Sequence, residues 1–397
     1  MDKKKTESHA VGTPDSRMYD LIFLIVRLWL GRGQPLEIDD AKLSEAEAPY
    51  IMLVNHESFF DFYYVSKLSH PKRPSYLVNE YYCTRPILKQ MASRGGILSK
   101  KLFTRDMSTA VGLLRMIRKG FPVVIFPEGR LSPDGRSNPI VEKGGALYKK
   151  LKVDLVLTRI EGAYFAAPKW RSRSYRSKVR ITVRRVIKRD ELQHMSVEEI
   201  DRLIASELYQ DASAAPIDIY PQRGKARGLE NLLYRCADCG ALYQTESDGN
   251  TLFCRACGSR HELDERYRFR DELVSIGGYY ERIRQMELQE LDGVSLRCEV
   301  DTLIHGANGG PKRRERGVCT LTPEGFSYSS GSLDITVPIS ELPALAFSCG
   351  KEFELYHRDE LYYFYPVAQR KQVARWALLV DLLNEKRCAE QETSGRR

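Results

Sequence analysis

The stretch YIMLVNHESFFD, residues 50–61, decides the fold of the N-terminal part of this chain. Its first five residues are apolar and suit one buried strand, and a polar segment follows without a break. Further short apolar runs at 75–78, 121–126 and 153–157 alternate with helical patterns. Because this alternation is typical of strand–helix–strand units, we expect an α/β domain with a largely parallel sheet.

Polar residues follow two of the expected strands at their carboxyl ends. NHESFFD follows 50–54, and PEGR follows 121–126. In open α/β sheets ligands bind at this edge, so we expect the two segments to converge there. His56 stands at a strand-to-helix junction, and its ring can fold back onto Asp61 at the start of the next helix. Such a pair fixes the histidine tautomer and leaves the other ring nitrogen free to take a proton from a hydroxyl group.

The source of that hydroxyl is predicted to be the substrate. No serine or cysteine has the context of a nucleophile elbow, and no His/Glu set has the spacing of a zinc hydrolase. At these residues the sequence resembles the glycerolipid acyltransferases, which make phosphatidic acid from lysophosphatidic acid or acylate glycerol 3-phosphate. Their first motif, N-H-x-S-x-x-D, is complete at 55–61, and their third, F-P-E-G followed by Thr or Arg, is complete at 126–130. The likeness covers roughly residues 17–190.

The resemblance implies a role for each matched residue. His56 is expected to act as general base on the acceptor hydroxyl, which attacks the thioester of acyl-CoA or an acyl carrier protein, and Asp61 is expected to orient His56. The expected substrate-binding residues are Asn55, Ser58, Arg105, Glu128, Gly129 and Arg130. Arg130 suits a phosphate because the planar guanidinium can donate two hydrogen bonds to it.

The second and fourth motifs of that family are less regular here. The segment GGILSKKLFTRD, 95–106, has extra residues, so Lys100, Lys101 or Arg105 is the candidate phosphate ligand. The strand DLVLTRI lacks the proline of the usual fourth motif. The identity of the acceptor therefore stays open.

Four cysteines form a second candidate site, apart from the acyltransferase motifs. They are Cys236, Cys239, Cys254 and Cys257, arranged as two Cys-x-x-Cys pairs that are each followed by glycine. This spacing predicts a closed tetrahedral site for a structural Zn²⁺ and resembles a zinc ribbon. Redox-active thiols are the alternative. With these pairs, the cysteine pattern indicates a reducing compartment.

We expect three folded parts joined by two connecting segments. The ranges are 1–210 for the acyltransferase-like domain with an N-terminal interfacial helix, 211–230 for a linker, 231–265 for the zinc ribbon, 266–292 for a helical connector and 293–397 for a mainly-β domain. The last part looks like a pleckstrin-homology-like or GRAM-like domain that is closed by a helix. The basic segment KRRER, 312–316, is either a lipid-binding loop or a solvated one.

Charge and one apolar segment indicate a lipid surface as partner. The 397 residues carry 62 Lys+Arg and 53 Asp+Glu, a formal charge of +9, which favours a polyanionic partner, either phospholipid headgroups or nucleic acid, and charge alone does not choose between them. The run 21–30 is about half the ~20 residues that span a bilayer. We therefore expect either an interfacial helix or a helix packed on its own domain. The basic segment 169–189 either faces anionic lipid or is simply solvated. The expected location is the cytoplasmic face of a membrane, as a peripheral protein, with no nucleic acid partner.

A function from a different class stays open beside the enzyme. In that alternative the zinc ribbon is an adaptor that binds protein or nucleic acid, and the acyltransferase-like domain is inactive and senses lipid. The two hypotheses differ in whether function depends on His56 or on Cys236.

Overall fold

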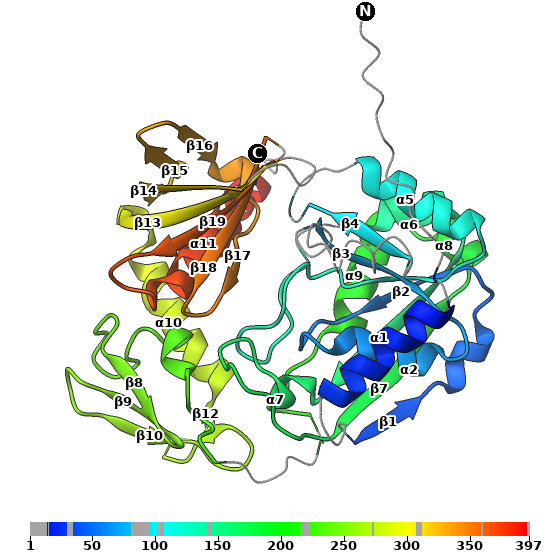
Figure 1. The fold of residues 1–397 in the computed structure, drawn as a ribbon, viewed down its shortest axis with the longest axis horizontal. Coiled ribbons are helices and arrows are strands. Elements are labelled where there is room, and N and C mark those ends of the chain that lie inside the picture. The colour runs from blue at the N-terminus through cyan, green and yellow to red at the C-terminus, as the bar shows by residue number, and fades with distance from the viewer. Residues whose placement is uncertain are drawn as a thin grey trace, which may run out of the picture.

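The computed structural model shows an α/β body beside a C-terminal sheet, with a small cysteine-bearing unit next to that sheet (Figure 1). It describes residues 14, 16–29, 35–80, 96–101, 103, 107–140, 144–215, 217, 223–271, 274–306, 312–358 and 360–394. The statements below concern these residues.

The α/β body is built on a seven-stranded sheet in the order β1-β7-β6-β2-β5-β3-β4. Its strands are β1 (Leu36–Asp39), β2 (Tyr50–Val54), β3 (Ser75–Asn79), β4 (Ile97–Lys100), β5 (Val123–Ile125), β6 (Asp154–Glu161) and β7 (Val179–Ile187). Neighbouring strands are parallel except for β6 and β7. The predicted α/β class and the four predicted strands are confirmed, and β5 is shorter than expected.

Helices cover both faces of this sheet. They are α1 (Ser16–Trp29), α2 (Asp61–Ser69), α5 (Met107–Arg118), α6 (Gly145–Leu151), α7 (Ala163–Ala166), α8 (Arg189–His194) and α9 (Val197–Leu208), with the 3₁₀ turn η1 (Ala41–Glu45). Tyr50, Met52 and Val54 pack in the cluster on the α2 side, whereas Ile51 and Leu53 pack in the cluster on the α5, α6 and α9 side. Because β2 is buried on both faces, its sequence is apolar at every position.

The second seven-stranded sheet is antiparallel, in the order β16-β15-β14-β13-β19-β18-β17. Its elements are β13 (Leu296–His305), β14 (Lys312–Thr322), β15 (Gly325–Ser330), β16 (Asp334–Pro338), η5 (Ile339–Glu341), β17 (Ala346–Ser348), β18 (Glu352–His357), β19 (Glu360–Pro366) and the closing helix α11 (Gln372–Ser394). Trp376 of α11 stacks on Phe353 at 5.0 Å between ring centroids. The C-terminal mainly-β unit with a closing helix is as expected, and its likeness to a particular domain family stays a prediction.

The basic segment 312–316 is a strand, not the loop that the sequence indicated. It forms the first half of β14, where Arg316 lies opposite Asp301 and Nε donates to its carboxylate at 3.0 Å. Arg313 likewise donates to Glu360 at 2.9 Å. The consecutive charged residues of this solvated strand thus pair with acidic side chains on other strands of the sheet, and a run of charges in the sequence does not reveal such pairs.

The small unit that lies between the two large sheets in the sequence contains β8 (Thr245–Asp248), β9 (Thr251–Cys254) and β10 (Arg260–Glu262) in one sheet, and β11 (Arg268–Phe269) with β12 (Val274–Ser275) in another. It also includes η2 (Leu229–Asn231), α10 (Ile276–Gln289) and η3 (Leu291–Gly293). One hydrophobic cluster runs from Tyr164 of α7 through this unit to Leu383 of α11. Ala226 and Leu229 of the expected linker belong to this cluster. The C-terminal parts are therefore packed against the α/β body as well as tethered to it.

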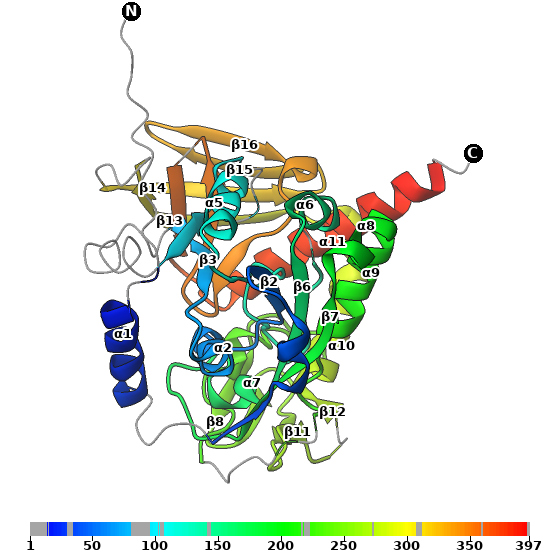
Figure 2. The ribbon, with the colours of Figure 1, turned by 90° about the vertical axis from the view of Figure 1, so that its right-hand side faces the viewer.

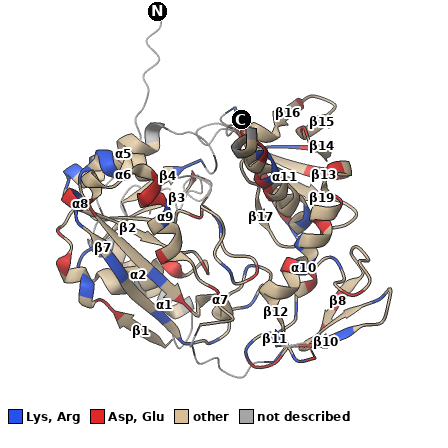
Figure 3. Cartoon of the chain, turned by 180° about the vertical axis from the view of Figure 1, so that it is seen from behind, with Lys and Arg blue, Asp and Glu red and all other residues tan. Residues whose placement is uncertain are grey.

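The N-terminal helix α1 lies at the edge of the molecule (Figure 2). Tyr19 is buried and its hydroxyl lies 2.8 Å from Ser66 Oγ of α2, and Asp20 pairs with Arg73 at 3.3 Å. Within the described part of the chain, no helix combines the length and apolarity needed to cross a bilayer. Lys and Arg are interspersed with Asp and Glu along the helices and strands (Figure 3).

Candidate active site

His56 and Asp61 meet at the carboxyl end of β2. The short segment after Val54 turns back on itself, so that His56 Nδ1 lies 2.9 Å from Asp61 Oδ2 at the first residue of α2. The same oxygen accepts the backbone N–H groups of Glu57 at 2.8 Å and Ser58 at 2.9 Å. Burial raises the pKa of Asp61, and the bond to His56 opposes that rise. The predicted contact is present, and the N-terminus of α2 favours negative charge on this residue.

The His56 ring is held in one orientation and is partly open to solvent. It stacks on Phe126 with ring centroids 4.3 Å apart, and 22% of its side chain is exposed. Because Nδ1 faces a carboxylate, the neutral ring carries its proton there and Nε2 keeps a lone pair. This arrangement can take a proton from a hydroxyl at Nε2, and Asp61 then stabilises the imidazolium.

Glu128 of the PEGR segment joins the two motifs from inside the protein. Its Oε1 accepts the backbone N–H of His56 at 2.9 Å. Its Oε2 accepts both the backbone N–H of Asn138 at 2.7 Å and the Asn138 side-chain amide at 3.0 Å. Burial raises the pKa of Glu128 to about 7. In this structure Glu128 positions His56, and its expected contact with an acceptor stays a prediction.

Asn55 and Ser58 also face the interior. Asn55 Nδ2 donates to the carbonyl of Ile160 at 2.9 Å, and its Oδ1 accepts the Ile160 N–H at 2.7 Å, which ties the end of β2 to β6. Ser58 Oγ accepts the N–H of Phe60 at 3.2 Å. Both side chains are fully buried. They shape the loop that carries His56, and substrate contact by either stays a prediction.

Gly129 is required by the backbone of the PEGR turn. Its φ is +68°, and a Cβ would lie 3.2 Å from the ring of Phe103. Lys100 ends β4 and Lys101 follows it, whereas Arg105 lies outside the described residues. The geometry therefore explains the glycine and leaves open which basic residue of the second motif serves a phosphate.

Arg130 contacts the C-terminal unit. Its Nη2 donates to Asp381 Oδ2 of α11 at 2.5 Å. The Arg130 side chain is 6% exposed and that of Asp381 is 21% exposed. Arg130 Nη1 is buried without a hydrogen-bond partner among the described residues. Binding of a phosphate by Arg130 stays a prediction, and the partner that the structure shows is the carboxylate of Asp381.

Two residues of the site were not predicted. Glu57 is fully buried within the first motif and its Oε2 accepts the N–H of Tyr164 at 3.0 Å. Burial and the neighbouring Asp61 raise the pKa of Glu57 well above its ordinary value. Asp381 lies 251 positions from Arg130, in another unit of the chain. Glu57 occupies the variable position of N-H-x-S-x-x-D, and Asp381 is far from the motifs in sequence. The sequence pattern therefore gives no indication of a role for either residue.

The four cysteines come together as predicted. Their sulfur atoms all lie within 4.8 Å of one another, so they could hold a metal ion. Cys236 Sγ lies 3.8 Å from Cys257 Sγ, and Cys239 Sγ lies 3.8 Å from Cys254 Sγ. Four thiolates around Zn²⁺ at about 2.3 Å stand at about 3.8 Å from one another, so the donor set fits this metal.

Two comparisons relate this chain to known proteins. The chain is similar to the crystal structure of the 1-acyl-sn-glycerophosphate (LPA) acyltransferase, PlsC, from Thermotoga maritima, with 16% identity and a TM-score of 0.40 over 48% of this chain and 76% of that chain. The model of the Acyltransferase family matches residues 36–158. The segment that matches this family model carries His56, Asp61 and Glu128.

Proposed function

We propose that this protein is an O-acyltransferase of phospholipid biosynthesis. It moves a fatty acyl group from acyl-CoA or acyl carrier protein to the hydroxyl of a lysophospholipid, with lysophosphatidic acid as the first acceptor to test, or of glycerol 3-phosphate. The observation that carries this proposal is the 2.9 Å contact between His56 Nδ1 and Asp61 Oδ2 in the domain that matches the Acyltransferase family.

The proposed reaction uses Nε2 of His56, the ring nitrogen that does not face Asp61. His56 Nε2 takes the proton of the acceptor hydroxyl as its oxygen attacks the thioester carbonyl. The carbon–sulfur bond of the tetrahedral intermediate then breaks, and the imidazolium returns the proton to the departing thiolate. Asp61 stabilises the imidazolium between these steps, and Glu128 holds the main chain of His56 in place. General base catalysis of this kind contributes roughly 10²–10⁴-fold to a rate.

The membrane surface is the proposed location, on the cytoplasmic face. Leu21, Leu24, Ile25 and Leu28 of α1 are each at least half exposed, from 50% to 70%. A helix that is fixed to its domain by Tyr19 and leaves aliphatic side chains in water suits the interfacial layer of a bilayer. The side chains of Arg27 and Trp29, which the sequence placed in the same helix, lie outside the described residues.

The cysteine cluster is proposed to hold a structural Zn²⁺. Its four thiolates would close the coordination sphere, so the metal has no open position and takes no part in acyl transfer. Its role is to hold together a unit whose strands are only two to four residues long.

The experiment compares lipids of cells that express the wild type with cells that express H56A, by mass spectrometry. The proposal expects an acylated glycerolipid that accumulates with the wild type and is absent with H56A. H194A is the matched control, because His194 is exposed at the end of α8 and far from the motifs in sequence. If H56A retains the effect of the wild type and C236S loses it, the adaptor hypothesis replaces the enzyme.

A further inference from the structure

The C-terminal unit packs on the edge of the α/β sheet where the candidate site lies. Tyr356 of β18 shares a hydrogen bond of 2.6 Å with Asn79 at the carboxyl end of β3. Lys169, which follows α7, places its ammonium over the ring of Phe347 of β17, 3.5 Å from the centroid. The two sheets face each other across this boundary in Figure 1.

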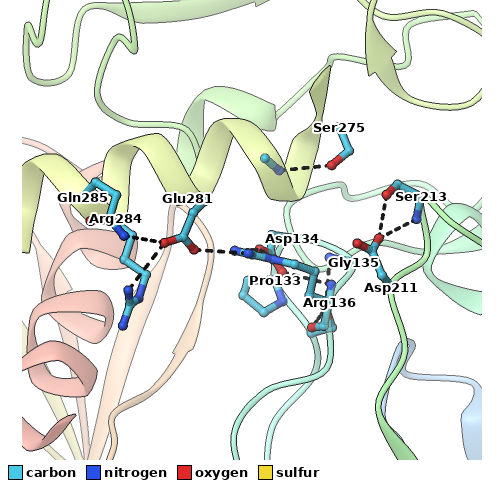
Figure 4. A network of polar contacts seen from close by, with 12 residues as sticks. Pro133, Asp134, Gly135, Arg136, Asp211, Ser213, Ser275, Glu281, Arg284 and Gln285 are labelled. Atoms are coloured by element: carbon cyan, nitrogen blue, oxygen red, sulfur yellow. Dashed lines mark hydrogen bonds and ion pairs between the residues drawn. The ribbon is translucent and has the colours of Figure 1, made fainter. Parts of the chain in front are cut away.

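The loop after the PEGR motif is fastened to α10 of the small cysteine-bearing unit. Arg136 bonds to Asp134 within the loop at 2.7 Å and to Glu281 of α10 at 3.1 Å (Figure 4). α10 can approach so closely because residue 277 is glycine, where a Cβ would lie 3.1 Å from the Arg136 side chain. The motif loop is thus held from outside its own domain.

Within this boundary, Asp381 is the partner of the one arginine in the PEGR motif. The carboxylate bonds to a guanidinium that is almost fully buried, and it is the more exposed member of the pair. An incoming anion would therefore meet the carboxylate side of the pair first. Because Asp381 neutralises Arg130, the motif offers a phosphate less attraction than a free arginine would.

We propose that Asp381 is a specificity-determining residue of the acyltransferase site, supplied by the C-terminal unit. Its carboxylate competes with the acceptor phosphate for Arg130 and lowers the preference for acceptors that carry a phosphomonoester over acceptors with an uncharged headgroup. This inference rests on the proposed acyltransferase function and deepens it.

The test measures kcat/KM of the purified full-length chain for lysophosphatidic acid and for a monoacylglycerol with the same acyl chain. The readout is the ratio of the two values. D381N removes the carboxylate that competes for Arg130, so the ratio should rise by about tenfold. A factor of ten corresponds to about 1.4 kcal/mol, which is the contribution expected of one charge-assisted hydrogen bond. E385Q is the matched control, because Glu385 lies one turn further along α11 and pairs with Arg284. Its ratio should equal that of the wild type.

A second pair of variants keeps the test decisive if D381N folds poorly with an unpaired buried arginine. R130M leaves the Asp381 carboxylate without its cation, so it should repel an acceptor phosphate and the ratio should fall about tenfold below that of the wild type. R130M/D381N removes both charges, which is better tolerated than removing one, and should restore the wild-type ratio.

The outcomes separate this inference from the function on which it rests. If R130M and R130M/D381N lose the preference for lysophosphatidic acid equally, Arg130 binds phosphate without regard to Asp381 and the inference is overturned. An unchanged ratio in folded D381N overturns it as well. If the wild type acylates neither acceptor in a manner that depends on His56, the proposed function itself has failed.

Discussion

Glu128 Oε1 accepts the backbone N–H of His56 at 2.9 Å, so the third motif of this domain supports the main chain of the first. The other oxygen of the same carboxylate is bonded to Asn138. The two loops at the carboxyl ends of β2 and β5 are thereby fixed to each other by one buried side chain.

Replacing Glu128 with glutamine should lower both stability and turnover. The amide would turn an NH₂ group toward N–H donors on one side, so one buried donor loses its acceptor at a cost of about 1–3 kcal/mol. We expect kcat to fall by more than tenfold with a small change in KM. Steady-state kinetics and urea unfolding of E128Q measure the two effects, and a normal kcat would show that His56 does not need this support.

The contribution of Glu128 to stability should also depend on pH. Its pKa is raised to about 7 in the folded protein from an ordinary value of 4.5, so the folded state binds the proton more tightly than the unfolded chain. Stability from this group is therefore fully present below about pH 4.5 and is lost as the pH rises through about 7. The difference in unfolding free energy between the wild type and E128Q should be larger at pH 5 than at pH 8, and the reverse order would contradict the assignment.

Glu57 should tolerate the same change much better than Glu128. Burial raises the pKa of Glu57 well above its ordinary value and so favours the neutral acid, which glutamine resembles in charge and shape. E57Q should unfold with a free energy within about 1 kcal/mol of the wild type at pH 7, because replacements that conserve volume and charge cost little. At alkaline pH the variant should become the more stable protein. Urea titrations at both pH values check this, and a large loss at pH 7 would show that Glu57 is ionised.

The cysteine cluster should bind one zinc ion per chain. Native mass spectrometry of the purified protein should show the mass of the chain plus one zinc ion, and the C236S variant should lack the added zinc. Because the cysteine unit shares its hydrophobic core with α7 and α11, a strong chelator should lower the melting temperature of the whole chain. C388S is the control, since Cys388 is exposed on α11 and outside the cluster. A metal-free protein with an unchanged melting temperature after chelation would contradict the prediction.

The exposed side chains of α1 should carry the affinity for membranes. L24D combined with L28D should abolish co-sedimentation with vesicles that contain anionic lipid, without a change in melting temperature. V111D is the matched control, because Val111 is 53% exposed on α5 and lies on another helix. Equal binding by the wild type and the α1 variant would place the membrane contact elsewhere.

Much of the fold and the main dyad could be predicted from sequence because their determinants are local. A strand buried on both faces is apolar throughout, as 50–54 is, and a histidine five residues before an acid at a strand–helix junction can reach it. Contacts between distant units have no such signature. The pair of Arg130 and Asp381 and the strand pairing of 312–316 depend on how the C-terminal unit docks, which no local pattern reports.

The central claim is that His56, oriented by Asp61, is the base of an acyl transfer. The most direct test is the rate of phosphatidic acid formation by purified wild type, H56A and D61N from acyl-CoA and lysophosphatidic acid. We predict product with the wild type and a loss of roughly 10²-fold or more in both variants at unchanged melting temperature. A folded H56A protein that forms product at the rate of the wild type would contradict the account.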